Sequence, residues 1–424
     1  MSDSERYLSR RSFLKKSSLG AVAGLALGGE RIPRAAAAAT GDRRTAADMS
    51  CALIGYGEWG REIAATMGRV EEANLVTVCD SYDVMLRRAR RSLPGIHTTA
   101  EYREVLDDPE IDAVLVATPT PLHRQIVEDA LSAGKHVYCE APLAHTIEDA
   151  RVIAAAAAAR PDQIFQAGLL YATEPQYRSV FGFIRSGALG QAAMARGQWH
   201  LRDSWRRTSP SADRERALNW RLREEHSIGL PGEVGVQQYD TANWILGSRP
   251  AAVSGFGGIM YWKDGRTIPD TVQTVLEYPG GTNMMYDATL VAGFDAMYDL
   301  FFGSDSTIIL RDSKAWMFKE VDAPMLGWEV YARKDKFYKE TGIALLANAT
   351  QLDSLGQDPA ADDPNIDTPL FYALNAFKDN FHFGPYAPAA DYSRGYESTV
   401  VAIKAHEAVM TGERQELTDE MFTI

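Results

Sequence analysis

The stretch Cys51-Ala-Leu-Ile-Gly55-Tyr-Gly57-Glu-Trp-Gly60 decides the fold of the N-terminal part, because an apolar strand leads directly into a glycine-rich turn. Helical spacing of apolar residues follows from Arg61 to Val70. A G-x-G-x-x-G pattern between a strand and a helix is typical of a dinucleotide site, where the glycines permit a tight turn, close approach of a pyrophosphate and close helix packing. The helix N-terminus then faces the anion. The pattern makes six residues candidates for cofactor binding: Gly55, Tyr56, Gly57, Glu58, Trp59 and Gly60.

Asp80 ends the next predicted strand, Leu75–Asp80, and follows Gly60 by 20 residues. A carboxylate at this spacing binds the ribose diol in the adenosine half of a dinucleotide. Because the same carboxylate repels a 2′-phosphate, the sequence favours NAD over NADP. The hydroxyl of Ser81, beside it, can soften that preference.

The alternation of strands and helices continues to about residue 175. The further predicted strands are Ala113–Ala117, His136–Cys139 and Gln163–Ala167, and the further predicted helices are Tyr82–Ser92, Pro121–Ala133 and Asp149–Arg160. Short apolar strands that alternate with helices indicate a parallel sheet covered on both faces. The sequence therefore predicts an α/β protein with a Rossmann domain over residues 48–175.

Residues 176–424 have a different pattern. Long segments of alternating hydrophobicity predict strands with one wet face, at Ala192–Leu201, Ala252–Trp262, Thr271–Tyr278, Thr282–Thr289, Asp299–Phe302 and Thr307–Arg311. Helices are predicted at Val236–Leu246, Pro369–Asn380 and Ser393–Thr411, and an acidic, proline-containing loop at 353–367. We expect an α+β domain with a large, mostly antiparallel open sheet.

The first 44 residues carry the features of an export signal. Ser9-Arg10-Arg11-Ser12-Phe13-Leu14-Lys15-Lys16 is a twin-arginine pattern, followed by a weakly apolar stretch and an alanine run with A-x-A cleavage sites. This pattern predicts a signal peptide and linker over 1–44 and a periplasmic or secreted protein. Since that route carries folded proteins, it suits a chain that loads its cofactor before export, and such a cofactor has to be tightly bound.

Composition excludes several classes of protein. The 424 residues carry a formal charge of −13, which argues against nucleic-acid binding. No apolar run reaches the roughly 18–20 residues of a membrane span. The three cysteines, Cys51, Cys79 and Cys139, lie in or beside apolar strands, so we expect core residues rather than a disulfide, and no spacing suggests a metal site.

Three further segments resemble the glucose–fructose oxidoreductase / inositol dehydrogenase (Gfo/Idh/MocA) family. They are Ile111-Asp-Ala-Val-Leu-Val-Ala-Thr-Pro-Thr-Pro-Leu-His123, Ala133-Gly-Lys-His-Val-Tyr-Cys-Glu-Ala-Pro142 and Gly232-Glu-Val-Gly-Val-Gln-Gln-Tyr-Asp-Thr-Ala-Asn-Trp244. The resemblance implies an NAD(P)-dependent oxidoreductase that acts on a sugar or polyol. It also implies a homo-oligomer, a dimer or tetramer, formed through the open sheet of the 176–424 domain. The residues that it places at the cofactor or its loops are Thr118, Pro119, His123, Glu140, Ala141 and Pro142, although His123 can equally cap a helix near Pro121.

The chain departs from the family pattern at two catalytic positions. The family usually has Glu-Lys-Pro where this chain has Glu140-Ala141-Pro142, and an acid/base histidine where this chain has Gln237. An amide does not titrate, so Gln237 can only form hydrogen bonds. Glu233, Gln237 and Asp240 are spaced for one face of a helix and are the candidate catalytic residues, with the two carboxylates as the leading candidate bases.

Three explanations remain open. The chain is a dehydrogenase with an atypical base (further candidates are His226, Tyr171 and His382), or it runs a non-redox reaction on sugars through transient oxidation, or it binds cofactor and ligand without catalysis. Seven aromatic residues around the expected cleft suit the CH faces of a sugar: Trp199, Trp205, Trp220, Tyr239, Trp244, Tyr261 and Trp262. Arg202, Arg206, Arg207 and Arg221 are able to bind a carboxylate or a phosphate, but the arginine-rich segment Trp205–Arg223 has rather the features of a solvated insertion or a subunit contact.

Overall fold

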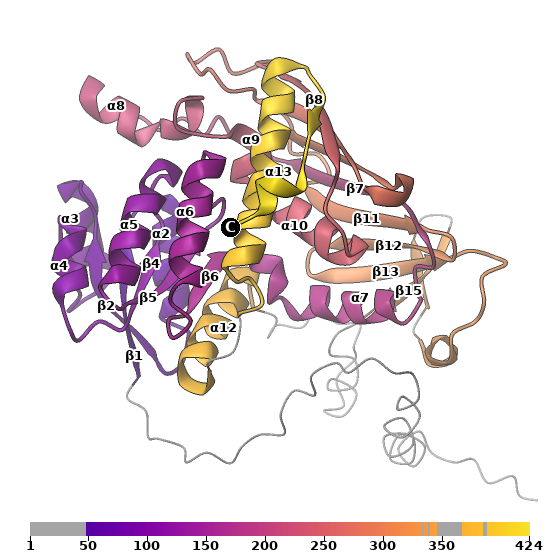
Figure 1. The fold of residues 1–424 in the computed structure, drawn as a ribbon, viewed down its shortest axis with the longest axis horizontal. Coiled ribbons are helices and arrows are strands. Elements are labelled where there is room, and N and C mark those ends of the chain that lie inside the picture. The colour runs from indigo at the N-terminus through magenta and orange to yellow at the C-terminus, as the bar shows by residue number, and fades with distance from the viewer. Residues whose placement is uncertain (1–47, 333, 338–339, 346–366, 385–387) are drawn as a thin grey trace, which may run out of the picture. The chain divides into compact units, whose positions relative to one another are not determined.

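The computed structural model describes residues 48–332, 334–337, 340–345, 367–384 and 388–424 (Figure 1). The predicted export signal at 1–44 and all of the predicted acidic loop except Asp367 lie outside the described residues. No helix in the described part of the chain is both long and apolar enough to cross a membrane.

Six parallel strands form the sheet of the N-terminal part, which we call sheet A. They are β1 (Met49–Ile54), β2 (Ala73–Cys79), β3 (His97–Thr99), β4 (Ala113–Val116), β5 (His136–Glu140) and β6 (Phe165–Gly168), in the order β3-β2-β1-β4-β5-β6. The predicted parallel sheet is confirmed. Because the strand order reverses between β1 and β4, their carboxyl ends border a crevice where open α/β sheets bind ligands.

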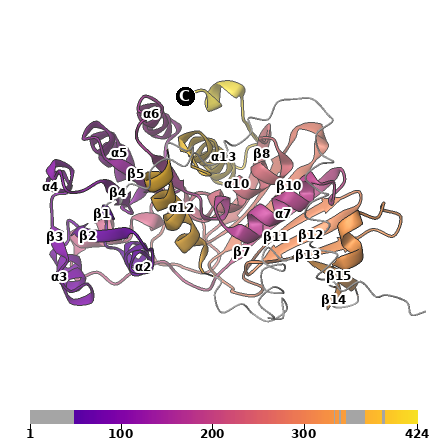
Figure 2. The ribbon, with the colours of Figure 1, turned by 90° about the horizontal axis from the view of Figure 1, so that it is seen from below.

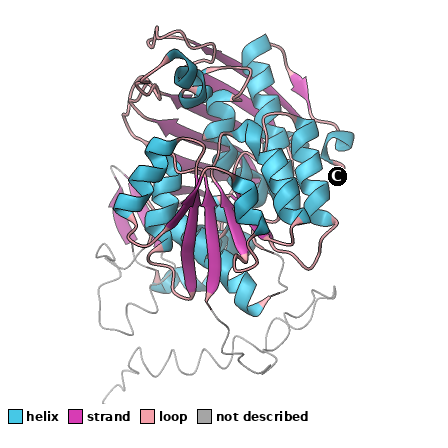
Figure 3. Cartoon of the chain, turned by 90° about the vertical axis from the view of Figure 1, so that its left-hand side faces the viewer, coloured by secondary structure: helices cyan, strands magenta, loops and turns pink. Residues whose placement is uncertain are grey.

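Helices cover both faces of sheet A (Figure 3). They are α2 (Glu58–Met67), α3 (Asp83–Ser92), α4 (Tyr102–Asp107), α5 (His123–Ser132) and α6 (Ile147–Ala158). A helix from the far end of the chain, α12 (Pro369–Phe383), also packs here: Phe377 is fully buried in the same core as Leu53, and its ring lies edge-on to Tyr138 at a centroid distance of 6.0 Å. The Rossmann core is therefore completed by a late segment of sequence.

Ten strands form the second sheet, sheet B. They are β7 (Ala192–His200), β8 (Ala252–Gly258), β9 (Thr271–Glu277), β10 (Asn283–Thr289), β11 (Met297–Gly303), β12 (Ser306–Arg311), β13 (Lys314–Lys319), β14 (Lys334–Phe337), β15 (Glu340–Leu345) and β16 (Gln415–Glu416). Only the β7–β10 pair is parallel among them, which confirms the mostly antiparallel sheet. The predicted strand Ala252–Trp262 ends at Gly258, because Asp270 accepts the backbone N–H groups of residues 260–262 and draws them out of the ladder.

The remaining helices connect or cover the two sheets. They are α7 (Pro175–Arg185), α8 (Ala212–Leu218), α9 (Gly229–Glu233), α10 (Gly235–Leu246) and α13 (Tyr392–Thr411), with 3-10 turns at Thr120–Leu122, Leu170–Ala172, Trp220–Leu222, Pro279–Gly281, Gly327–Tyr331 and Asp419–Phe422. Helix α13 starts at its cap Asp391, which accepts the N–H of Arg394, and ends at Gly412 with a φ of 71°. It packs against α6, α10 and β8 and so joins the two sheets (Figure 2). The three cysteines are free and buried, as predicted.

Candidate functional site

A cavity of about 400 Å³ lies at the carboxyl ends of β1, β2 and β4. Its volume is within the range of roughly 300–1,000 Å³ that is usual for cofactor and ligand sites. One wall carries the glycine-rich turn and the loop after β4, and the other wall carries a segment that precedes α9. The lining residues include Gly55, Gly57, Glu58, Trp59, Asp80, Ser81, Thr118, Pro119, Trp205, Arg207, Arg214, Trp220 and Arg221.

The three glycines of the turn have the geometry that a dinucleotide needs. Gly55 has a φ of +99°, and a Cβ there would lie 2.5 Å from the carbonyl oxygen of Ala117. A Cβ on Gly60 would lie 2.0 Å from the oxygen of Gly55, so only glycine lets α2 approach the turn. A Cβ on Gly57 would meet nothing within 4 Å, which leaves its backbone open to a ligand at the N-terminus of α2. The turn therefore fits a diphosphate.

Asp80 lies in the cavity wall at the end of β2. Its carboxylate accepts the backbone N–H groups of Tyr56 and Tyr82, each at 2.8 Å. These bonds hold the carboxylate beside the glycine-rich turn, and each oxygen keeps lone pairs that can accept a ribose hydroxyl.

The opposite end of the cavity has polar atoms without partners. The Thr118 Oγ1 and Trp59 Nε1 atoms of the lining, and the Oε1 atom of Glu140, which is not itself a lining residue, are buried and form no well-aligned hydrogen bond among the described residues. These atoms include both hydrogen-bond donors and acceptors. An amide, such as the carboxamide of nicotinamide, can bond to both kinds because it has an N–H₂ group and a carbonyl oxygen. Burial raises the pKa of Glu140 to about 7, against smaller lowering effects of Trp59, Tyr138 and Arg221.

His123 fixes the two loops that carry these residues. Its ring is buried at the start of α5, with Nε2 3.0 Å from the Thr118 oxygen and Nδ1 3.2 Å from the Leu143 oxygen. Burial lowers its pKa to about 4, so the ring is neutral near pH 7 and donates to one carbonyl at a time. The Leu143 carbonyl follows Ala141 and Pro142, which are joined by a cis peptide bond.

The expectation that Glu233, Gln237 and Asp240 share one helix face is wrong. Helix α9 ends at Glu233, and Val234, with a φ of −132°, separates it from α10. The Gln237 side chain binds backbone on both sides: its Nε2 donates to the Gly168 oxygen at 2.7 Å, and its Oε1 accepts the Leu170 N–H at 2.9 Å. A Cβ on Gly168 would touch Glu140, so Gln237 holds the backbone against which Glu140 packs.

Asp240 faces a different part of the molecule. Its side chain is 3% exposed and forms a bidentate ion pair with Arg394 of α13, with distances of 2.7 Å and 2.6 Å, and it also accepts the Ser398 hydroxyl at 2.9 Å. It lines a separate cavity of about 890 Å³ between α10 and α13. Its carboxylate is thus fully engaged in joining these helices.

Glu233 contacts the dinucleotide cavity through Arg221. Its side chain is 3% exposed; Oε2 accepts Arg221 Nε at 3.0 Å, and Oε1 accepts the Ser227 hydroxyl at 3.1 Å. Burial raises the pKa of Glu233, and the charge of Arg221 opposes this rise. Arg221 itself lines the cavity and also lowers the pKa of Glu140.

Sequence reasoning considered Arg221 as a ligand for a carboxylate or phosphate but did not select it as a site residue. It belongs to the arginine-rich segment Trp205–Arg223, several residues of which line the cavity; that the segment forms a subunit contact stays a prediction. The sequence contained one signal for Arg221. Glu233 lies in an apolar run, which indicates a buried carboxylate, and a buried carboxylate needs a cation such as an arginine nearby. The further candidate bases His226, Tyr171 and His382 do not line the cavity; Glu140 and Glu233 do not line it either, but each interacts with Arg221, which does. No group of three His, Cys, Asp or Glu side chains in the described residues is placed to hold a metal.

Two family models match the chain. The model "Oxidoreductase family, NAD-binding Rossmann fold" of GFO/IDH/MocA covers residues 49–168, and that of the "GFO/IDH/MocA C-terminal domain" covers residues 177–309. Levoglucosan dehydrogenase of Pseudarthrobacter phenanthrenivorans is 32% identical over 40% of this chain and 42% of its own length. The NAD⁺-dependent scyllo-inositol 2-dehydrogenase of Bacillus subtilis is 29% identical over 50% of this chain and 58% of its own length.

A solved structure supports the fold over most of the described chain. The complex of levoglucosan dehydrogenase with NADH superposes with a TM-score of 0.70 at 20% identity, over 87% of this chain and 99% of that one. Together with the family models and the glycine-rich cavity, this likeness leads to one conclusion: the chain belongs to the GFO/IDH/MocA oxidoreductase family, with an NAD-binding Rossmann domain at its N-terminus.

Proposed function

We propose that this protein is an NAD-dependent oxidoreductase that oxidises a hydroxyl group of a sugar, a polyol or a sugar derivative. The observation that carries the proposal is the dinucleotide cavity lined by Trp59, Thr118 and Arg221, with the carboxyl of Glu140 buried beside Trp59 and within the electrostatic reach of Arg221. The two named relatives act on levoglucosan and scyllo-inositol, which supports a polyhydroxylated substrate.

Nicotinamide, when bound, supplies a hydride acceptor for the carbon that carries the reacting hydroxyl. The residues of this chain then have to bind the hydroxyl oxygen and remove its proton. Arg221 is a donor that stays charged, so it can hold the oxygen but not accept the proton. Glu140 has a free buried oxygen and a pKa of about 7, which suits a general base at neutral pH. We assign Glu140 as the base and Glu233 as the residue that positions Arg221.

This assignment accounts for the two departures from the family pattern. Ala141 removes the usual lysine, and Arg221 brings a cation from another segment. Gln237 replaces the usual histidine, and its amide supports the backbone beside Glu140 instead of moving a proton. In this proposal the base moves to a buried carboxyl beside the same cavity.

Three further properties belong to the proposal. The twin-arginine pattern at Arg10–Arg11 supports export, and export supports a cofactor that stays bound through successive turnovers, with a second substrate reoxidising it. The exposed apolar side chains of Met194, Phe256 and Met285 on sheet B support a homo-oligomer formed through that sheet. Analysis of nucleotide released on denaturing the exported protein, and its mass in solution, test these properties.

The function is tested by mixing the protein and NAD with a panel of sugars and polyols and following the fluorescence of reduced nicotinamide. We expect at least one panel member to reduce the cofactor, and substitution Glu140→Gln to abolish that signal. Conversion of a sugar to products of unchanged oxidation level, without accumulation of reduced cofactor, would support the non-redox alternative. No conversion and no reduction across the panel would contradict both enzymatic functions and leave the binding protein.

A further inference from the structure

We propose that the segment Asp203–Leu222, which we call the strap, forms part of the dinucleotide site. In this site Arg207 binds the diphosphate of the cofactor and Arg214 covers its adenosine. The strap leaves sheet B after β7 and includes helix α8 (Figure 1). Its residues Trp205, Arg207, Arg214 and Arg221 line the cavity, and Leu222, at its end, is buried. The inference rests on NAD binding but not on any catalytic activity.

The charges around the cavity carry the argument. Every charged residue that lines it from the Rossmann side is acidic, namely Glu58 and Asp80. Every charged residue that lines it from the strap is basic, namely Arg207, Arg214 and Arg221. A dinucleotide brings two negative charges on its diphosphate, and the Rossmann wall of the cavity offers only backbone dipoles to meet them. The strap therefore supplies the side-chain cations of this site.

Arg207 is held at the glycine-rich turn. Its guanidinium pairs with Glu58 in the first turn of α2, at 2.8 Å from Nη2 and 3.1 Å from Nε, and with Asp203 at 3.2–3.3 Å. Glu58 directly follows Gly57, whose open backbone is the predicted diphosphate contact. These contacts use four of the five N–H donors and leave one, on Nη1, that can donate a charge-assisted hydrogen bond to a phosphate oxygen.

Arg214 occupies the adenosine end of the cavity. Its guanidinium carbon lies 4.0 Å from the ring centroid of Tyr82, two residues after Asp80. Its Nε is buried and has no hydrogen-bond partner among the described residues. Arg214 and Tyr82 thus present flat surfaces beside the carboxylate that is expected to bind the ribose.

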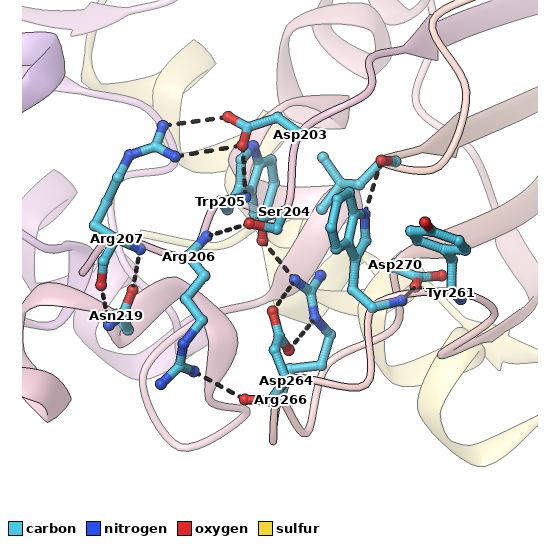
Figure 4. Close-up of polar contacts among 12 residues, drawn as sticks. Asp203, Ser204, Trp205, Arg206, Arg207, Asn219, Tyr261, Asp264, Arg266 and Asp270 are labelled. Atoms are coloured by element: carbon cyan, nitrogen blue, oxygen red, sulfur yellow. Dashed lines mark hydrogen bonds and ion pairs between the residues drawn. The ribbon is translucent and has the colours of Figure 1, made fainter. Parts of the chain in front are cut away.

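Buried contacts fix the backbone of the strap (Figure 4). Asn219, 4% exposed, binds the Arg207 backbone at both its N–H (2.7 Å) and its oxygen (2.9 Å). Arg266, whose side chain is fully buried, binds the Ser204 oxygen and Asp264. Trp205 has a φ of +60°, a left-handed conformation that a non-glycine residue keeps only where its surroundings hold it. Such fixed geometry distinguishes the strap from a solvated insertion.

The experiment measures NADH binding and release without substrate, by nicotinamide fluorescence, on the full-length protein. Arg207→Gln should raise the Kd and the release rate about 10- to 100-fold, since hydrogen bonds to a charged group contribute about 1.5–3 kcal/mol. The matched control is Arg216→Gln, which removes the same charge from an exposed position of α8 that does not line the cavity. Equal release rates for the Arg207 and Arg216 variants would overturn the proposal.

Cofactor fragments separate the two assignments. Arg207→Gln should weaken ADP-ribose and leave adenosine unchanged, whereas Arg214→Gln should weaken both. If Arg207→Gln fails to fold, Arg207→Lys keeps the charge without the planar fork and should weaken ADP-ribose by a smaller factor; unchanged ADP-ribose binding in this variant overturns the role of Arg207. A protein that releases NADH as expected but oxidises no sugar would contradict the proposed function and leave the strap assignment intact.

Discussion

Arg221 and Glu233 form an ion pair that connects a buried carboxylate to the dinucleotide cavity. The Nε–Oε2 distance is 3.0 Å, and the side chains are 43% and 3% exposed, respectively. The Arg221 guanidinium also packs over the rings of Trp220 and Trp205, with distances of 5.2 Å and 5.9 Å to their centroids. The cation is therefore held on three sides while it faces the cavity, an arrangement that can orient a substrate oxygen.

Loss of the Glu233 charge should weaken substrate binding more than cofactor binding. In Glu233→Gln, Arg221 loses a charge-assisted hydrogen bond of about 1.5–3 kcal/mol, so we expect KM for the sugar to rise about tenfold or more. Ser227→Ala is the control, because it removes only a neutral donor to the same carboxylate. A Glu233→Gln variant with unchanged KM and reduced kcat would show that Glu233, and not Glu140, is the base.

The pH dependence of oxidation tests the assignment of Glu140. With a pKa of about 7, this carboxyl is mostly protonated below that pH and cannot accept a proton, so kcat/KM for sugar oxidation should rise as the pH increases through 7. In the Glu140→Gln variant the rise of kcat/KM with pH, which is the rising limb of the profile, should disappear, and the rate of sugar oxidation should fall about 10²–10⁴-fold.

Asp299 provides a control for this pH profile. Burial also raises its pKa to about 7, but it lies in sheet B, where it accepts hydrogen bonds from Gln238 and Tyr177. Asp299→Asn should therefore keep the rising limb. If the limb disappears in Asp299→Asn and persists in Glu140→Gln, the assignment of the base is wrong.

Asp240 should act on stability rather than on proton transfer. Asp240→Asn leaves the partly buried guanidinium of Arg394, 22% exposed, without its counter-charge, which should cost up to about 3 kcal/mol in the free energy of unfolding. Denaturant unfolding measures this cost, and Ser398→Ala, which removes one neutral donor, should cost about 0.5–1.5 kcal/mol. A folded Asp240→Asn protein of normal stability without turnover would instead support Asp240 as the base.

The preference for NAD should depend on Asp80. Asp80→Ser removes the carboxylate that a 2′-phosphate has to approach, so the ratio of Kd for NADPH to Kd for NADH should fall about tenfold, or about 1.4 kcal/mol. Taking the ratio cancels any general loss caused by breaking the bonds to Tyr56 and Tyr82. Equal affinity of the unmutated protein for both cofactors would place the ribose elsewhere.

Local pattern predicted most of the fold. The apolar runs of sheet A and the alternating hydrophobicity of strands β7, β9 and β10 are patterns within short stretches of sequence, so these strands could be predicted. Helix α12 is predicted as a helix, but its packing on sheet A depends on Phe377 meeting Tyr138, more than 200 positions earlier in the chain. Sequence pattern contains no information on such a contact.

The site was predicted in part, for a similar reason. The glycine-rich turn is a contiguous motif, and Asp80 follows it at fixed spacing, so both could be found. Arg221 becomes a site residue only because the strap crosses the cavity, and Gln237 becomes a backbone support only because the loop at Gly168 and Leu170 passes beside it. These functions arise from tertiary contacts.

Transfer of hydrogen from substrate carbon to the cofactor tests the central claim most directly. Protein and NAD are mixed with a substrate found in the panel that carries deuterium on the carbons of its hydroxyl groups, and the cofactor is then examined by mass spectrometry. We predict reduced cofactor that contains one substrate-derived deuterium, together with a substrate oxidised at the corresponding carbon. Reduced cofactor without deuterium, or converted substrate with all of its deuterium and only oxidised cofactor, would contradict the account.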